Sequence, residues 1–326
     1  MRRPWLVTGC LVGGDAIATR MTEAEKEQQR KARPIEAKES LRWLEGIRAA
    51  REVAEACPKT QCVCVADSEA DIYELLAEPR ATVRGGELQL LIRACQDRAL
   101  SEAAGCLMAA VRATPCVAQN TVDVSARRPQ IKIKDTKRQA ARDARLAVVE
   151  IRATTVTLQP PPRPDRKLPA VTINVVLVEE VDPPAGETPL QWLLITTLPI
   201  GDAKQVLLIV QYYSVRWQIE VYFRTLKSGC RVESRYFERV GRLRNCLAVY
   251  SIVAWKILYL CRLSRECPDL NCEVVFEPAE WKAVYLAVRQ RELPKTPPSL
   301  NEMVRMIASL GGYVIRRTTQ PGTQTL

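Results

Sequence analysis

The sequence predicts an α+β protein with an α/β core, and three observations support this fold class. In the first hundred residues, short apolar runs alternate with amphipathic stretches, as expected for strands followed by helices. Between residues 121 and 199, apolar residues recur at every second position, which is typical of half-buried strands. From residue 203 to residue 310, helical periodicity dominates. With 326 residues, 47% of them hydrophobic, the chain is long enough for two or three domains with a real core.

The first part of the chain, residues 1–96, is expected to begin the core. Its apolar run at residues 61–66 ends at Asp67, and the spacing of Ser68 and Asp71 resembles a capping box that opens the helix DIYELLAE. The other expected elements are a strand at 5–12, a solvated charge run at 21–33, an amphipathic helix at 36–57 and a strand at 88–94.

Residues 97–200 are expected to form a β-rich insertion. Three alternating runs, LAVVEIRATTVTL, VTINVVLVEEV and LQWLLITTLP, are separated by the proline-rich turn signals PPPRPDRKLP and DPPAGETP. The insertion therefore interrupts the core rather than continuing its alternation of strands and helices.

Helices are expected again from residue 203. We assign residues 201–262 to the remainder of the core and residues 263–326 to a C-terminal helical region. The apolar stretch 246–263 contains Lys256, so we expect a buried helix rather than a membrane span. A proline-rich linker at 294–298 leads to a last helix at 299–310, which the pair Gly311-Gly312 ends.

The composition favours a polyanionic partner and excludes several kinds of active site. Lys and Arg number 48 against 37 Asp and Glu, a net charge of +11 that favours nucleic acid. The chain has no histidine, which removes the usual Ser-His-Asp and Cys-His nucleophile systems and histidine-ligated zinc or iron. Carboxylates without histidine point to Mg²⁺ or Mn²⁺ as a cofactor.

The twelve cysteines show no C-x-x-C spacing. We therefore expect buried, reduced thiols and a reducing cytoplasm, not a disulfide framework or a zinc finger. The alternative is a metal-binding cluster at Cys261, Cys267 and Cys272, whose spacing is irregular.

The most informative segment is residues 211–229, which we predict to be one helix with two distinct sides. Its signature is Tyr213-x2-Arg216-x3-Glu220-x6-Lys227. At about 100° per residue these four side chains fall within roughly 60° of one another, with Trp217 and Arg224 at the edges. The opposite stripe is apolar and is expected to face the core; it comprises Val215, Ile219, Tyr222, Phe223 and Leu226.

Both carboxylates in these motifs also have a simpler interpretation. Glu220 has the spacing of a helical surface pair with Arg216, and Asp67 has the position of a helix cap. The pair does not explain why an indole, a phenol and further cations share the same stripe. A carboxylate at the end of a strand, such as Asp67, is also well placed to reach a metal.

These motifs together resemble DDE-type transposases of the IS-four family, particularly those of the Tn-five type. The resemblance rests on the Y-x2-R-x3-E-x6-K helix and on three ordered blocks, VADSEADIYELL, LIRACQDR and VLVEEVDPPAGETPLQWLLITTLPI. It covers roughly residues 36–260 and, more weakly, the tail. It implies an RNase H-like core with two divalent ions, an inserted sheet domain and a helical dimerisation region.

The resemblance also implies roles for single residues. Asp67 and Glu220 match the second and third carboxylates of the DDE triad and would bind the metal. Tyr213, Arg216 and Lys227 resemble residues that grip phosphates near the transposon end. The further DNA contacts that the resemblance implies are Trp192 and Trp217, on a flipped base, and Arg93 and Arg224, on the backbone.

The family pattern places its first catalytic Asp ahead of the region that matches residues 5–20. By this resemblance the chain begins too late to contain that Asp or the domain that recognises transposon ends. Asp15 follows what resembles a later strand, and we do not assign it. We therefore expect a protein descended from cut-and-paste transposition enzymes that is inactive, or nearly so, by itself.

Two alternatives stay open at this point. A non-catalytic form would bind DNA or inhibit by forming mixed dimers with full-length transposase, whereas an active form would be a homodimer on transposon ends. A metal-dependent nuclease without a transposon role would instead cut arbitrary DNA. For each of them we expect a location in the bacterial cytoplasm, associated with the nucleoid and not with a membrane.

Overall fold

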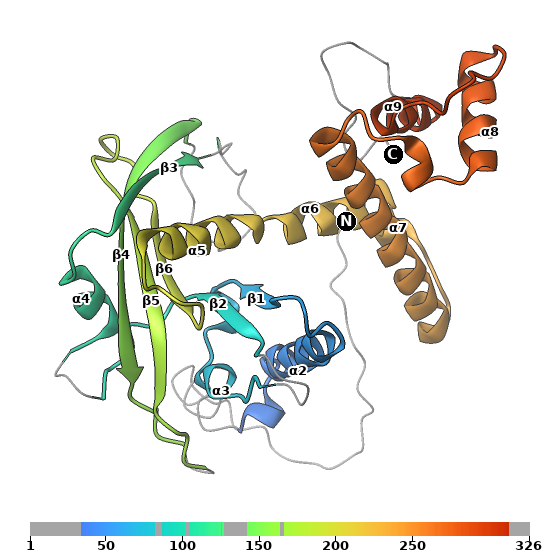
Figure 1. Ribbon diagram of the computed structural model, residues 1–326. Coiled ribbons are helices and arrows are strands. Elements are labelled where there is room, and N and C mark those ends of the chain that lie inside the picture. Colours follow the sequence, from blue (N-terminus) through green and yellow to red (C-terminus); the bar gives the residue numbers. More distant parts are fainter. Residues whose placement is uncertain are drawn as a thin grey trace. The chain divides into compact units, whose positions relative to one another are not determined.

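The computed structural model describes residues 34–81, 87–101, 105–124, 126, 142–163 and 166–312 (Figure 1). The strand expected at 5–12 and the charge run expected at 21–33 lie outside these residues. The chain divides into two compact units, Met1–Val210 and Gln211–Leu326, which we describe separately.

The first unit is built on one six-stranded sheet with the strand order β1-β2-β6-β5-β4-β3 (Figure 1). The strands are β1 Val63–Ala66, β2 Gln89–Arg93, β3 Ala118–Val124, β4 Arg145–Leu158, β5 Val171–Glu180 and β6 Gln191–Thr196. β1 and β2 are parallel, and every other neighbouring pair is antiparallel.

The inner strand β2 is buried on both faces, because Leu90, Leu91 and Ile92 have almost no exposed surface. Burial on both faces explains why the strand is a continuous apolar run and does not alternate. β2 also joins the two kinds of pairing in the sheet. It lies parallel to β1 on one side and antiparallel to β6 on the other, with Ile92 opposite Ile195.

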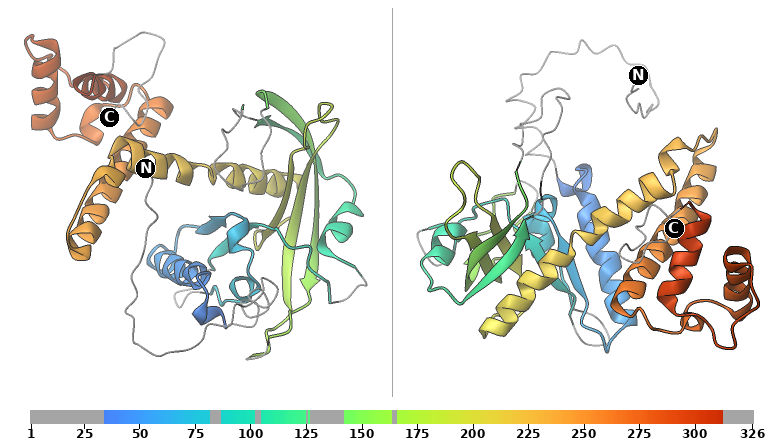
Figure 2. Two further views of the ribbon diagram at one scale, coloured as in Figure 1. Left: turned by 180° about the vertical axis from the view of Figure 1, so that it is seen from behind. Right: turned by 90° about the horizontal axis from the view of Figure 1, so that it is seen from above.

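Three helices pack on this sheet: α2 Leu41–Ala56, α3 Tyr73–Leu76 and α4 Leu107–Arg112. α2 contributes Leu44 and Ile47 to the same core cluster as β2 (Figure 2). α3 is a single turn, anchored by the buried Tyr73, whose hydroxyl donates to the carbonyl oxygens of Leu158 and Pro169 at 3.2 and 2.9 Å.

The second unit is helical in the residues described, and α5 begins before its boundary. The elements are α5 Ala203–Val215, α6 Gln218–Arg224, a π-helical segment Thr225–Gly229, α7 Val240–Glu266, α8 Pro278–Arg289 and α9 Leu300–Leu310. α9 contacts both α7 and α8, at the C-terminal end of α7 (Figures 1 and 2). Its N-terminus has the capping box of Ser299 and Glu302, which agrees with the predicted start of the last helix.

The predicted α+β class is confirmed, and each of the three predicted runs forms a strand, although burial does not alternate through β5 and β6. The strands between residues 118 and 196 are continuous with β1 and β2, because β6 pairs with β2 in the same sheet. The four-part division into 1–96, 97–200, 201–262 and 263–326 stays a prediction.

Two expectations about burial are wrong. The helix expected to be buried at 246–263 is α7, and its middle is largely exposed, including Ile252 and Trp255. The thiols are free as expected among the described cysteines, but Cys57, Cys95, Cys116 and Cys267 are exposed and not buried. In both cases composition alone gave no information on which apolar side chains find a partner surface.

Two buried carboxylates should make the first unit sensitive to acid. Arg145 donates two hydrogen bonds to Glu180 and thereby holds the pKa of Glu180 below its usual range, despite burial. Burial raises the pKa of Glu74. The hydrogen bonds from Arg163, together with the charges of Arg163 and Arg166, outweigh burial and leave the pKa lowered. A depressed carboxyl pKa stabilises the fold above the unfolded-state value of about 4.3.

We therefore expect the free energy of unfolding to fall as pH drops from about 5 through the lowered pKa values. The stabilisation is fully present above the unfolded pKa and is lost as each folded-state carboxylate protonates. Urea unfolding followed by circular dichroism at a series of pH values measures this slope. Glu180→Gln should flatten it, and parallel pH curves for the variant and the wild type would contradict the assignment.

Candidate active site

Asp67 lies directly after the last residue of β1. It is half-buried and has an extended backbone, and its Oδ1 accepts a hydrogen bond from the Glu69 amide at 3.0 Å. The side chain therefore caps the 3₁₀ helix Ser68–Ala70, as the simpler interpretation predicted. The cap also fixes this carboxylate at the carboxyl end of β1, where α/β sheets place their ligand sites.

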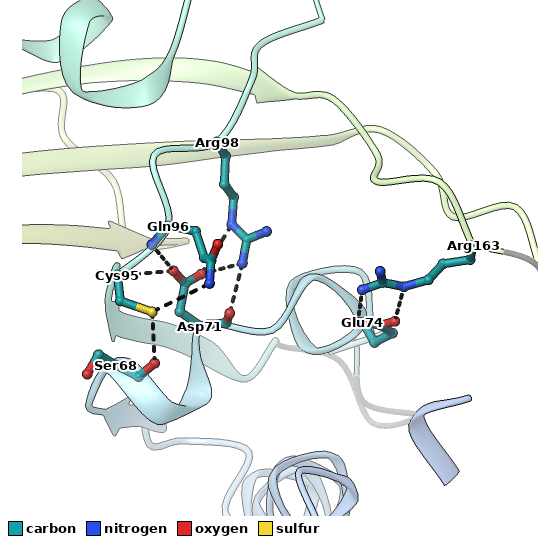
Figure 3. Close-up of polar contacts among 7 residues, drawn as sticks. All are labelled: Ser68, Asp71, Glu74, Cys95, Gln96, Arg98 and Arg163. Atoms are coloured by element: carbon teal, nitrogen blue, oxygen red, sulfur yellow. Dashed lines mark hydrogen bonds and ion pairs between the residues drawn. The ribbon is translucent and has the colours of Figure 1, made fainter. Parts of the chain in front are cut away.

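The segment that carries Asp67 is held in place by the buried carboxylate of Asp71 (Figure 3). One oxygen of Asp71 accepts hydrogen bonds from the amides of Cys95 and Gln96, each at 2.8 Å. The other accepts from Nη2 and Nε of Arg98 at 2.5 and 3.2 Å. Asp71 therefore ties the loop after β1 to the loop after β2.

A second link joins the same two loops. The Cys95 thiol lies 3.4 Å from the carbonyl oxygen of Ser68, the residue that follows Asp67 (Figure 3). Burial, and then the neighbouring Asp71 carboxylate, raise the pKa of the Cys95 thiol. The thiol thus stays protonated at neutral pH and donates its hydrogen to Ser68, which favours a structural role for Cys95 over a nucleophilic one.

Arg93 and Trp192 lie at the same end of the sheet as Asp67. Because Ala66 is opposite Ile92 in the parallel pair, Asp67 and Arg93 follow at adjacent positions on neighbouring strands. The exposed Arg93 donates from Nη2 to the Gln191 carbonyl oxygen at 3.2 Å, next to the half-buried Trp192 at the start of β6. The first unit therefore brings together three residues that were predicted separately.

The predicted single helix at 211–229 is wrong. α5 ends at Val215, a turn follows at Arg216 and Trp217, and α6 is succeeded by the π-helical segment Thr225–Gly229. Within the turn, the Ile219 amide donates to the Arg216 carbonyl and the Glu220 amide donates to the Trp217 carbonyl, both at 3.1 Å. No proline or glycine marks this break, so the sequence pattern had no signal for it.

The break changes which side chains face solvent. Tyr213, predicted on the working side, is only 6% exposed, so its placement there is wrong. On the predicted core side, Leu226 is buried, but three other members are exposed, and this stripe is also wrong as stated. The exposed members are Val215, Ile219 and Phe223.

Of the remaining predicted residues of this segment, Arg216 lies next to Glu220. Arg216 Nη2 donates to Glu220 Oε1 at 2.9 Å, so the predicted surface pair is present. Lys227 Nζ lies 3.9 Å from Glu233 Oε1. Trp217 is 57% exposed and Arg224 is also exposed.

The donor set suits a hard divalent ion that also binds substrate. Among the residues that the structure describes, no group of three or more Asp, Glu or Cys side chains is arranged to hold a metal. The predicted alternative of a metal site at Cys261, Cys267 and Cys272 is therefore wrong. Mg²⁺ is usually held by one or two carboxylates together with waters and substrate phosphates, and the metal role of Asp67 and Glu220 stays a prediction.

The family model described as "Transposase DDE domain" matches residues 45–253, roughly two thirds of the chain. The chain belongs to the DDE transposases. A second model, "Transposase Tn5 dimerisation domain", matches residues 252–326 and relates this transposase to Tn5. The first match contains all nine predicted site residues, and the family has an RNase H-like fold and acts on DNA as an enzyme.

Sequence reasoning missed the role of Asp71, which it treated as part of a capping box with Ser68; that prediction is wrong, because α3 begins at Tyr73 without a side-chain cap. The partners of Asp71 lie 24 to 27 positions away, so no local spacing reveals the network. In this transposase Asp71 is a positioning residue for the loop that carries Asp67.

Replacing Asp71 should therefore destabilise the first unit strongly. Asp71→Ala leaves Arg98 and two backbone amides without their partner, at a cost of roughly 3–5 kcal/mol. Urea unfolding measures the difference. Glu69→Ala is the matched control, because it removes an exposed ion pair with Arg42, 2.8 Å long, worth about 1 kcal/mol or less. Equal losses for the two variants would contradict a special role for Asp71.

Proposed function

We propose that this DDE transposase belongs to the cut-and-paste class, in which DNA is nicked, forms a hairpin and is joined to a target. The observation that carries the proposal is the placement of Asp67 beside Arg93 and Trp192, within the matched domain, on a loop fixed by a buried network. A carboxylate, a cation and an indole at one end of a sheet suit a metal, a phosphate and a base.

We assign Asp67 and Glu220 as the carboxylates that hold Mg²⁺ or Mn²⁺. A divalent ion bound there would activate water or a 3′-hydroxyl and stabilise the leaving oxygen. Arg216 orients Glu220 through their hydrogen bond, which fixes the carboxylate before DNA arrives. The exposed cations of Arg224 and Lys227 suit contacts to the phosphates on either side of the reacting one.

Trp217 and Trp192 are proposed to hold a base that leaves the duplex when the DNA end forms a hairpin. The exposed indole of Trp217 provides a stacking surface, and base–aromatic stacking is worth about 1–3 kcal/mol. Arg93 is proposed to contact the backbone nearby, and the role of Tyr213 in phosphate binding stays a prediction.

The proposed partners are transposon-end DNA and a second transposase subunit. The dimerisation match indicates that members with this domain form dimers, and we propose a homodimer for this chain. A second candidate function is that of a non-catalytic inhibitor in mixed dimers with full-length transposase. Such a subunit would act in the bacterial cytoplasm, on the nucleoid.

We propose that the chain by itself has little or no activity, because the resemblance matches two carboxylates of the DDE triad, Asp67 and Glu220, and assigns no third. A strand-transfer assay with purified protein, transposon-end DNA and Mn²⁺ tests this. Robust cleavage would contradict the proposed low activity. Co-purification with full-length transposase, together with loss of that enzyme's activity, would support the inhibitor function.

Metal binding can be measured without turnover. Asp67→Asn and Glu220→Gln should each weaken Mn²⁺ binding in the presence of DNA by about tenfold or more, because each removes a charged oxygen ligand. Mn²⁺ paramagnetic resonance measures the affinity, and Glu52→Gln, an exposed carboxylate on α2, serves as the control. An unchanged affinity in both site variants would refute the assignment.

DNA binding should depend on salt through the lysine and arginine contacts. Lys227→Ala should weaken binding to all DNA sequences similarly and reduce the slope of log affinity against log salt by about 1. Fluorescence anisotropy at several salt concentrations measures both quantities. Lys59→Ala removes an equally exposed charge in the first unit, and the same loss of slope in that control would show that Lys227 makes no specific contact.

A further inference from the structure

Trp192 lies close to the start of β6, next to a long connection between two strands. Residues 181–190, all of them described, form no helix or strand, and Trp192 is only the second residue of β6. A strand end beside such a connection is held by few ladder hydrogen bonds and opens easily. The proposed base-holding role needs an indole in a fixed position, so contacts outside the ladder have to supply that position.

The two residues that precede Trp192 are held by the last two carboxylates of β5. Glu180 Oε2 accepts a hydrogen bond from the Leu190 amide at 2.7 Å. Glu179 Oε1 accepts one from Gln191 Nε2, also at 2.7 Å, and these two residues lie opposite each other in the antiparallel pair. Both residues before Trp192 are therefore fixed by side chains as well as by the ladder.

Glu179 and Gln191 lie on the face of the sheet opposite to the Trp192 side chain. Side chains at successive strand positions point to opposite faces. Leu177 and Leu193, which share the face of Glu179 and Gln191, belong to the main core cluster. Glu179 therefore acts on the indole through the backbone of Gln191.

A further contact fixes the same backbone from the Trp192 face. Arg93 is opposite Leu194 in the ladder between β2 and β6, which places it on this face. Its Nη2 donates to the Gln191 carbonyl oxygen at 3.2 Å. This carbonyl belongs to the peptide group that joins Gln191 to Trp192, so the peptide is held from both faces of the sheet.

Glu179 is itself anchored to the core. Arg112, the last residue of α4, donates to the same Glu179 oxygen that accepts from Gln191. The hydrogen bond from Arg112 holds the pKa of Glu179 below its usual range despite partial burial, so the carboxylate is charged at neutral pH and its hydrogen bonds are strong ones. α4 is fixed in turn by Leu107 and Val111, which are fully buried in the main core cluster.

We propose that Glu179 is the positioning residue for Trp192, because it holds Gln191 and thereby sets where the indole stands when a base leaves the duplex. This inference rests on the proposed base-holding role of Trp192 and is independent of the proposed metal carboxylates. Glu187 offers a matched comparison, since it lies in the connection before β6 and pairs with Arg145 at 3.0 Å. Replacing Glu187 removes the same charge and leaves the bond between Glu179 and Gln191 in place.

A DNA duplex with one unpaired 2-aminopurine at its end tests the assignment, because the fluorescence of this base falls when it stacks on an indole. The quenching by the full chain that Trp192→Ala removes is the part due to Trp192. Glu179→Ala should lose roughly half or more of this part, since a strand end without its anchor opens easily. Its affinity for a fully paired duplex, measured by anisotropy, should not fall, because loss of a negative charge cannot weaken attraction to phosphates.

The other variants separate positioning from a general effect on the fold or on charge. Glu179→Gln keeps an oxygen acceptor for Gln191 and should retain most of the quenching, and Glu187→Gln should quench like the wild type. Full quenching in Glu179→Ala would overturn the inference, as would an equal loss in Glu187→Gln. If Trp192→Ala quenches like the wild type, the proposed base-holding role fails as well.

A second variant serves if circular dichroism shows that Glu179→Ala does not fold. Gln191→Ala removes the partner of Glu179 and leaves the ion pair with Arg112 in place. It should lose the same part of the quenching, and an unchanged signal in this variant would overturn the assignment of Glu179.

Discussion

The arrangement of the first unit depends on a buried carboxylate whose charge is fully compensated. A lone carboxylate in this position would be strongly unfavourable, because the protein interior cannot solvate it as water does. Asp71 instead receives two backbone amides and the Arg98 guanidinium, which also donates to the Asp71 carbonyl oxygen at 2.8 Å. Since these donors come from the segment after β2, the network fixes the ends of two parallel strands relative to each other and gives Asp67 a defined position.

The residues proposed for catalysis and DNA binding form two groups, which are held in place by different structural elements. Asp67, Arg93 and Trp192 are placed by strand register and by the Asp71 network, so their mutual arrangement follows from a rigid sheet. Glu220 and its cations lie on short helical segments, where the Arg216 hydrogen bond is the main local constraint. The first group is therefore held by a regular sheet edge, and the second by a segment whose backbone is less regular.

Local patterns predicted the strands well and the helical segment poorly. The runs in residues 145–196 form β4, β5 and β6, but burial alternates clearly only in the first half of β4, whereas the middle of β5 and the end of β6 are continuously buried. No residue around Arg216 and Trp217 indicates the break after α5. The assumption of one uniform α-helix placed Tyr213 on the solvent-facing side, whereas it is buried. The Asp71 network could not be predicted because its partners are distant in sequence, and the exposure of α7 was missed because composition does not show which apolar side chains are covered.

The π-helical segment Thr225–Gly229 changes the angle between Glu220 and Lys227 around the helix axis, compared with a uniform α-helix. Its closing hydrogen bond runs from the Cys230 amide to the Thr225 carbonyl, five residues back, at 2.9 Å. Such a turn accommodates one residue more than an α-helical turn, so it delays the angular advance of everything that follows. The spacing of six residues between Glu220 and Lys227 therefore spans the start of a bulged backbone and not a uniform α-helix. Deleting one residue from the bulge would restore a uniform helix and leave the later side chains near their present azimuth.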